Sequence, residues 1–339
     1  MSKAGPFRTR ITELLGIEHP LIGGTMMHLS RAPLVAGISD GGGLGILASA
    51  IFADMGELRE ELQEIQRLTA RPFSVNLNFF PMLAPVPAAQ VLEVCLEEGV
   101  TLFESSGHSA PAGIPERIHE AGGVLVHKCA GVRYAKKAAS LGVDGVTVVG
   151  WENGGAMGML DVSTLALVPR VVEEVDLPVI GGGGVGGGRG FLALLALGAE
   201  GVIMGTAFLL AEECPIHPRI KDALCSASEL DTVPIMRSIR ATHRAWRNGA
   251  ADKVVDIERD NTGPDGVATD QGAMLGTLMP YISGKAAKKM FGEGDVDSGI
   301  LCVGQGIGQM REVLPAAEIV RRTVASAAEI RASLGTTVA

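Results

Sequence analysis

The chain has 339 residues, of which 47% are hydrophobic and 20% are charged, so it can bury a large core. Its formal net charge of −9 argues against the nucleic-acid-binding class, which relies on basic surfaces. No apolar run approaches membrane-spanning length, residues 1–10 lack the apolar stretch of a signal peptide, and five scattered cysteines show no metal-ligand spacing. We therefore expect a cytoplasmic protein with no membrane, nucleic-acid or metal partner.

One pattern recurs eight times from His19 to about Leu210: a short apolar run, a break at glycine or a polar residue, then a helical segment. The apolar runs cover residues 19–24, 44–49, 73–79, 101–107, 124–130, 145–151, 177–184 and 201–206. The segments between them carry apolar residues at spacings of three and four, which is typical of helices. Continuous apolar strands alternating with helices indicate a parallel sheet, and eight such units predict an α/β fold, the TIM (β/α)8 barrel.

The pattern stops near Cys214. Residues 217–228 and 233–249 have helical patterns, and residues 260–272 are rich in glycine and aspartate, without another strand-like run of comparable quality. We expect a smaller, inserted, mainly helical cap domain over residues 214–302. The barrel then consists of residues 1–213 and 303–339, with a last helix at 316–334 returning to it.

A glycine-rich stretch, "GGGGVGGGRG" at residues 181–190, follows the seventh apolar run. It matches the dinucleotide-binding pattern, but the required acid should end the next strand, and Glu200 comes before that strand. In a barrel, the loops after the last two strands commonly bind phosphate. The residues predicted to do so are Gly182, Gly183, Gly184, Gly205 and Thr206. The alternative, that these glycines only permit tight turns, stays open.

Other polar residues fall at the ends of the predicted strands, where barrel enzymes place their chemistry. Lys128 ends an apolar strand and needs an anionic partner, which is either a ligand or the carboxylate of Glu152. Asn76 is a candidate to hydrogen-bond a ring edge or a neighbouring loop. The loop histidines His28 and His108 are candidate acid–base residues.

Taken in order, several motifs resemble the nitronate monooxygenase family (2-nitropropane dioxygenases), which is related to FMN-dependent enoyl-ACP reductases. The motifs are "ITELLGIEHPLIGGTM", "GGGLGILAS", "RPFSVNLNF", "VLVHKCAGVRYAKKAASLGVDGVTVVG", "LPVIGGGGVGGGRGFLALLALGAEGVIMGTAFL" and "VGQGIGQM". The resemblance implies a barrel that holds noncovalent FMN beneath a helical domain. The residues expected at the cofactor are Gly24, Thr25, Met26, Asn76, Lys128, Glu152, Gly154, Gly155, Gly182, Gly183, Gly184, Gly205 and Thr206.

The loop after the sixth strand departs from the family pattern. In the family this loop resembles E-x-G-G-H-x-G, and its histidine handles a proton beside the flavin. Here Ala156 occupies the histidine position. Because alanine cannot accept a proton, we expect altered proton chemistry, with His28 or His108 as candidates for that role.

These observations favour an FMN-dependent oxidoreductase that resembles nitronate monooxygenases and oxidises alkyl nitronates with O2. Neutral nitroalkanes should be poor substrates, because removal of their α-proton needs a base. A second hypothesis is a reductase of an enoyl thioester or quinone with NAD(P)H as electron donor. A third is a flavin-binding protein without catalysis, and a homodimer is also open.

Overall fold

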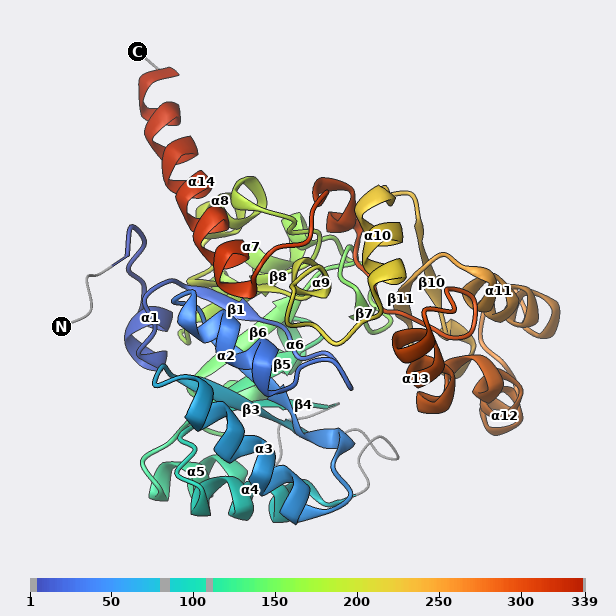
Figure 1. Cartoon of the computed structure of the whole chain (residues 1–339), viewed down its shortest axis with the longest axis horizontal. Helices are drawn as coiled ribbons and strands as arrows, with labels where there is room; N and C mark the ends of the chain where they lie inside the picture. The colour runs from blue at the N-terminus through green and yellow to red at the C-terminus, as the bar shows by residue number, and fades with distance from the viewer. Residues whose placement is uncertain (1–4, 80–85, 108–111, 338–339) are drawn as a thin grey trace.

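The structure is a computed structural model that describes residues 5–79, 86–107 and 112–337 (Figure 1). Eight parallel strands form one sheet in the order β1-β9-β8-β6-β5-β4-β3-β2. They are β1 (Leu21–Gly23), β2 (Gly45–Ala48), β3 (Phe73–Asn78), β4 (Leu102–Ser106), β5 (Val124–Cys129), β6 (Gly145–Val149), β8 (Val179–Gly182) and β9 (Gly201–Met204). A parallel bridge between Ile22 and Leu44 joins β1 to β2. The predicted TIM barrel is confirmed, and each strand lies within one of the eight predicted runs.

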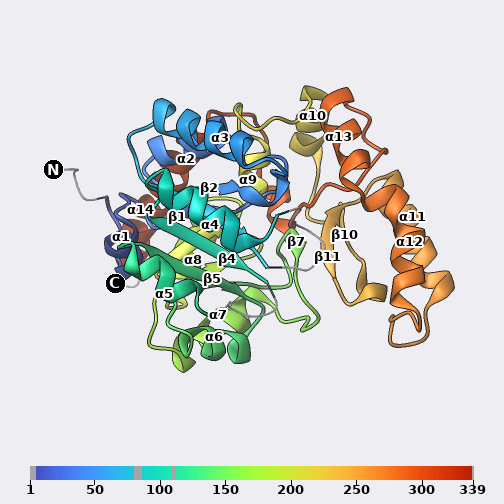
Figure 2. The same ribbon diagram turned by 90° about the horizontal axis from the view of Figure 1, so that it is seen from below.

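Helices cover the outer face of this barrel (Figures 1 and 2). They are α2 (Ala32–Asp40), α3 (Met55–Leu68), α4 (Ala88–Glu97), α5 (Ile114–Glu120), α6 (Val132–Ala139), α7 (Thr164–Glu174), α8 (Gly188–Ala196) and α14 (Ala316–Thr337). The last of these packs against α8 and α2, so the C-terminal segment completes the outer layer.

A short helix, α1 (Arg10–Leu15), closes the amino-terminal end of the barrel. Its Ile11 and Leu15 belong to the same apolar cluster as Ile22, Val126 and other side chains inside the barrel. Since apolar side chains fill this end, the polar chemistry lies at the opposite end of the strands.

The chain after β9 builds a second body beside the barrel (Figures 1 and 2). Its elements are α10 (Pro218–Ser226), β10 (Thr232–Ile235), η2 (Arg237–Ile239), β11 (His243–Trp246), α11 (Gly249–Asn261), α12 (Gln271–Ile282) and α13 (Gly284–Glu293). Two short helices, α9 (Thr206–Leu209) and η3 (Gln305–Gln309), contact each other, and α9 also contacts α14 of the barrel. The helical interpretation of residues 233–249 is wrong, because β10 and β11 pair antiparallel there. Their partner is β7 (Gly155–Ala156), a two-residue strand in the loop after β6.

Two apolar clusters distinguish these bodies. Val233, Ala245 and Leu278 belong to a small cluster confined to residues 233–300. By contrast, Ile220 and Trp246 belong to the large cluster shared with the barrel helices. Among the described helices, none is both long and apolar enough to cross a membrane. The division at residues 214 and 302 stays a prediction.

Candidate functional site

The carboxyl ends of the barrel strands bring a set of polar side chains into the barrel mouth. Leu102 and Val126 belong to the cluster inside the barrel. Because side chains alternate along a strand, Glu104 and Lys128, two residues further on, also face inward. Asn76 is the register partner of Glu104 on the adjacent strand. Three strands thus contribute a carboxylate, an ammonium and an amide to one space.

Glu104 organises one side of this mouth. Its carboxylate is buried and accepts hydrogen bonds from Thr25 Oγ1 at 2.8 Å and from Asn76 Nδ2 at 2.7 Å. Ser106 Oγ donates to Asn76 Oδ1 at 3.3 Å. Buried carboxylates are costly unless hydrogen bonds replace water, and these donors supply them. Glu104 therefore fixes the orientation of two residues, Thr25 and Asn76, that the sequence places at the cofactor.

Lys128 lies on the other side of the mouth and is half-buried. In the described part of the chain its ammonium makes no ion pair or hydrogen bond. The alternative partner, Glu152, is engaged elsewhere: its Oε2 accepts from Thr164 N at 2.9 Å and from Thr164 Oγ1 at 2.7 Å. This carboxylate holds the start of α7, so the charge of Lys128 is left for a ligand.

The glycine loops after β8 and β9 present backbone amides that have no acceptor in the described part of the chain. Gly183 and Gly184 have φ values of +109° and +72°, a left-handed backbone that favours glycine. The N–H groups of Gly183, Gly184, Gly205 and Thr206 donate no hydrogen bond to any described residue. Converging amides of this kind form a concavity for an anion. No described atom lies within 4 Å of a Cβ built on Gly205, so there is room for a ligand. A phosphate group fits this cradle.

The segment that returns from the cap closes over the neighbouring loop. Gly304 N donates to Thr206 Oγ1 at 2.9 Å, and Gln305 N donates to Glu152 O at 3.0 Å. A Cβ on Gly154 would lie 2.5 Å from Gly304 N. The close approach that Gly154 permits is therefore to the returning chain, while the hydroxyl of Thr206 holds that chain in place.

The small sheet connects the loop after β6 to the cap. In the β7–β11 register, Ala156 is opposite His243 and Gly155 is opposite Arg244. Residues directly opposite in an antiparallel pair place their side chains on the same face, about 5 Å apart at Cβ. The imidazole of His243 therefore emerges beside the methyl group of Ala156, which is exposed.

His243 is half-buried, with one ring nitrogen committed. Its Nδ1 lies 2.6 Å from the backbone oxygen of Ala241. A carbonyl oxygen can only accept, so Nδ1 carries the proton and the neutral ring has a basic Nε2. Burial lowers the pKa of His243, the hydrogen bond to Ala241 opposes this change, and the positive charge of Lys128 adds to it, so that the pKa is lowered. The protonated ring is thus less favoured here than in an exposed histidine.

Arg244 lies on the opposite face of β11 from His243 and holds the loop after β6 by a hydrogen bond to Trp151. It is buried, and its Nε donates to Trp151 O at 3.1 Å while Nη1 donates to Thr232 Oγ1 at 3.1 Å. Its guanidinium lies 5.2 Å from the centre of the Trp151 ring. Burial lowers its pKa, and the charge of Glu152 acts against that change. The cation is stabilised by a carbonyl and an aromatic face.

The remaining predicted residues are placed as follows. His28 has a φ of +65° and packs against the start of α13, where its Nε2 would lie 3.2 Å from a Cβ on Gly284. Burial lowers its pKa. His108 lies outside the described residues. Met26 packs against the large core, and Gly24 N donates to Met204 O at 2.8 Å.

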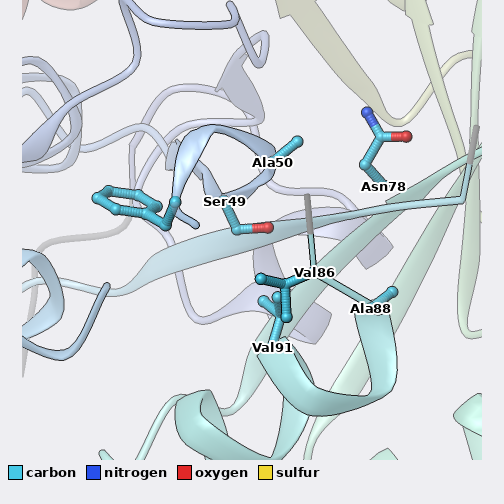
Figure 3. A pocket seen from close by; sticks show the side chains of 7 residues that line it. Ser49, Ala50, Asn78, Val86, Ala88 and Val91 are labelled. Carbon is cyan, nitrogen blue, oxygen red and sulfur yellow. The ribbon is translucent and has the colours of Figure 1, made fainter. Parts of the chain in front are cut away.

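A separate small cavity lies beside β2 and β3 (Figure 3). Its volume is about 10 Å³, and its lining includes Ser49, Asn78 and Val91. That volume holds about one water molecule, so this cavity is no substrate pocket. No group of histidine, cysteine and carboxylate side chains in the described residues is arranged to hold a metal ion.

Two residues at this site, His243 and Arg244, were missed at the level of sequence. Both residues fall within residues 233–249, where the sequence pattern predicts a helix. The signal was present as an alternation: Arg244 and Trp246 lie on one face of β11, and His243 and Ala245 lie on the other. An alternation over only four residues does not distinguish a strand from a helix or a loop as long as its partner strands are unknown.

The barrel and its glycine-lined mouth define an α/β-barrel enzyme. The family described as nitronate monooxygenase matches residues 8–326, and the chain belongs to this family. The curated relatives are named as a dehydrogenase and as probable nitronate monooxygenases, and this protein is an oxidoreductase.

Two curated relatives and one solved structure illustrate the similarity. The chain is 36% identical to (3aS,4S,5R,7aS)-5-hydroxy-7a-methyl-1-oxo-octahydro-1H-indene-4-carboxyl-CoA dehydrogenase of Rhodococcus jostii over 70% of this chain, but only 65% of that relative. It is 32% identical to a probable nitronate monooxygenase of Staphylococcus aureus, over 67% of this chain and 74% of the relative. FabK from Thermotoga maritima superposes with a TM-score of 0.85 at 30% identity, covering 97% and 99% of the two chains.

Proposed function

We propose that the protein is an FMN-dependent oxidoreductase whose cofactor lies at the barrel mouth. One observation carries the proposal: four amides from two glycine loops and the ammonium of Lys128, none with a partner among the described residues, lie at the same mouth. A phosphate accounts for the amides, and an electron-rich ring accounts for the ammonium. FMN carries both groups. When bound, it supplies the two-electron chemistry of the reaction.

The chain's own residues then have distinct tasks. Amides of Gly183, Gly184, Gly205 and Thr206 would hold the phosphate. Thr25 and Asn76, which Glu104 holds in place, would line the ring, and Lys128 would face its electron-rich end. Gly24, Met26 and Gly155 would complete the walls. Residues 214–302 would form a cap over the substrate.

Gly205 offers a test of the phosphate cradle. Its φ of −108° suits any residue, and its Cβ position is free of described atoms within 4 Å. We expect Gly205→Val to keep the fold and to weaken FMN binding at least about tenfold, because the new methyl groups occupy the cradle. Fluorescence titration of apoprotein with FMN measures this. Gly187→Val, also at an open position, is the matched control. Equal affinities in the two variants would contradict the cradle.

For the reaction, we propose oxidation of alkyl nitronates with O2, in line with family membership. A nitronate is already ionised, so the step that starts from it requires no base. Anaerobic bleaching of bound FMN by ethyl nitronate, followed by recovery on admission of O2, tests this. Absence of bleaching at saturating nitronate rules out this reaction.

The named relatives favour a second candidate, redox chemistry on an acyl thioester with a nicotinamide cofactor. Both the dehydrogenase of R. jostii and FabK resemble this chain at 30% identity or more. Stopped-flow mixing of the FMN-loaded protein with NADH and NADPH distinguishes the two. Rapid bleaching by either nucleotide, followed by reoxidation with an enoyl-CoA, supports the thioester reaction; bleaching by the nitronate alone supports the first.

A further inference from the structure

His243 occupies an unusual position for a histidine of the small sheet. It is the register partner of Ala156, and the two side chains share one face of the β7–β11 pair. Ala156 is exposed and its side chain has no polar atom, so on this face of the pair His243 carries the polar side chain. An imidazole reaches further from this face than the alanine methyl group.

The hydrogen bonding of the ring leaves one nitrogen for chemistry. Nδ1 donates to Ala241 O at 2.6 Å, which fixes both the orientation and the tautomer of the ring. Nε2 therefore carries a lone pair, and it has no hydrogen-bond partner in the described residues. A half-buried imidazole with one fixed and one free nitrogen is arranged as a general base requires.

Charge connects this ring to the barrel mouth. The ammonium of Lys128, inside the barrel at the end of β5, is close enough to disfavour the protonated ring. The strands packed against β11 contribute no charge, since β7 is Gly155–Ala156 and β10 is Thr232–Ile235. Arg244 lies on the other face of β11 and is turned toward Trp151. Among the described residues, Lys128 is therefore the charged group that lowers the pKa of His243.

We infer that Nε2 of His243 is the proton acceptor for a substrate bound between Lys128 and Ala156; this rests on the proposed function. With a neutral nitroalkane, the α-carbon–hydrogen bond breaks and the proton moves to Nε2. The electron pair moves into the nitro group, which leaves a nitronate. The sequence alone predicts that neutral nitroalkanes are poor substrates, whereas this placement of His243 predicts that they are used.

The first test needs no turnover. Long-range ¹H–¹⁵N correlation spectra of the imidazoles, assigned with His243→Asn, should show His243 as the neutral tautomer protonated at Nδ1. Its signal should move when FMN binds, with binding followed independently by flavin fluorescence. A tautomer protonated at Nε2 overturns the inference, as does a signal unmoved by bound FMN. Failure of FMN to bind instead counts against the proposed function, and the tautomer then decides the inference.

The second test compares nitroethane, which needs a base, with ethyl nitronate, which does not. In His243→Asn the amide of asparagine can still donate to Ala241, so the turn is kept while the basic nitrogen is lost. We expect the ratio of kcat/KM for nitroethane to that for ethyl nitronate to fall about 10²-fold or more. His119→Gln, at an exposed histidine on α5, is the control and should keep the ratio.

Rescue separates a chemical role from a structural one. Because Ala156 and His243 are opposite each other, Ala156→His in the His243→Asn background should recover part of the nitroethane ratio. An unchanged ratio in His243→Asn overturns the inference even when ethyl nitronate is oxidised. If ethyl nitronate is not oxidised at all, the proposed reaction is ruled out. The tautomer of His243 and its response to FMN then decide whether Nε2 is available as a proton acceptor.

Discussion

At the residue scale, the barrel mouth combines two charges with very different surroundings. Glu104 is buried but receives hydrogen bonds from Thr25 and Asn76, whereas Lys128 has no partner in the described residues. A satisfied carboxylate gives a rigid wall, and an unsatisfied ammonium gives a place for a ligand. The same ammonium also lowers the pKa of His243.

Replacing Lys128 tests this effect on the pKa of His243. We expect Lys128→Met to raise the pKa of His243, because a neighbouring positive charge that disfavours the protonated ring is removed. The pKa should stay below 6.5, since burial, the larger cause, remains. Titration of the His243 imidazole by NMR measures the change. Lys137→Met, at an exposed lysine of α6, should leave that pKa as it is. A lower pKa in Lys128→Met would contradict this effect.

At the element scale, the loop after β6 is held from three directions. Its Glu152 contacts the start of α7, its Gly154 lies under the returning segment, and its Gly155–Ala156 strand pairs with β11. Each contact joins this loop to a part of the chain distant in sequence. A short strand of two residues gains its conformation from such contacts rather than from its own propensity.

Gly154→Ala tests how tightly the returning segment closes on this loop. The new Cβ would lie 2.5 Å from Gly304 N and 2.8 Å from Val303 C, and backbone atoms cannot move aside without shifting the segment. We expect a loss of about 1–3 kcal/mol in the free energy of unfolding, measured in urea. Gly187→Ala is the control, because its φ of 171° is extended and no described atom lies within 4 Å. Equal stability of the two variants would show that the returning segment at Val303 and Gly304 can shift to make room at no measurable cost.

At the scale of the whole molecule, the barrel and the second body share a core. Trp246 comes from β11, yet its side chain packs in the large cluster with the barrel helices, and its backbone N–H donates to Leu301 O at 2.8 Å. Residues 303–309 then cross the barrel mouth before α14 joins the outer layer. The two bodies are therefore connected by packing as well as by the chain.

This shared core predicts one cooperative unfolding transition. The chain has two tryptophans, Trp151 and Trp246, and both lie where β11 meets the barrel, so their fluorescence reports on this junction. Far-UV circular dichroism reports on all helices. We expect both signals to change at the same urea concentration. A fluorescence change that precedes the loss of helix would show that the second body detaches first.

The sequence by itself determined the barrel, because eight apolar runs with helices between them have few other ways to bury their surface. It also placed the glycine loops and Lys128 at the strand ends, since strand ends are read directly from apolar runs. The tertiary structure decided which side chains meet. In the structure, Glu152 accepts a hydrogen bond from Thr164 rather than pairing with Lys128, and His243 lies opposite Ala156 on the neighbouring strand. Such pairings depend on strand register between distant segments, which no local pattern encodes.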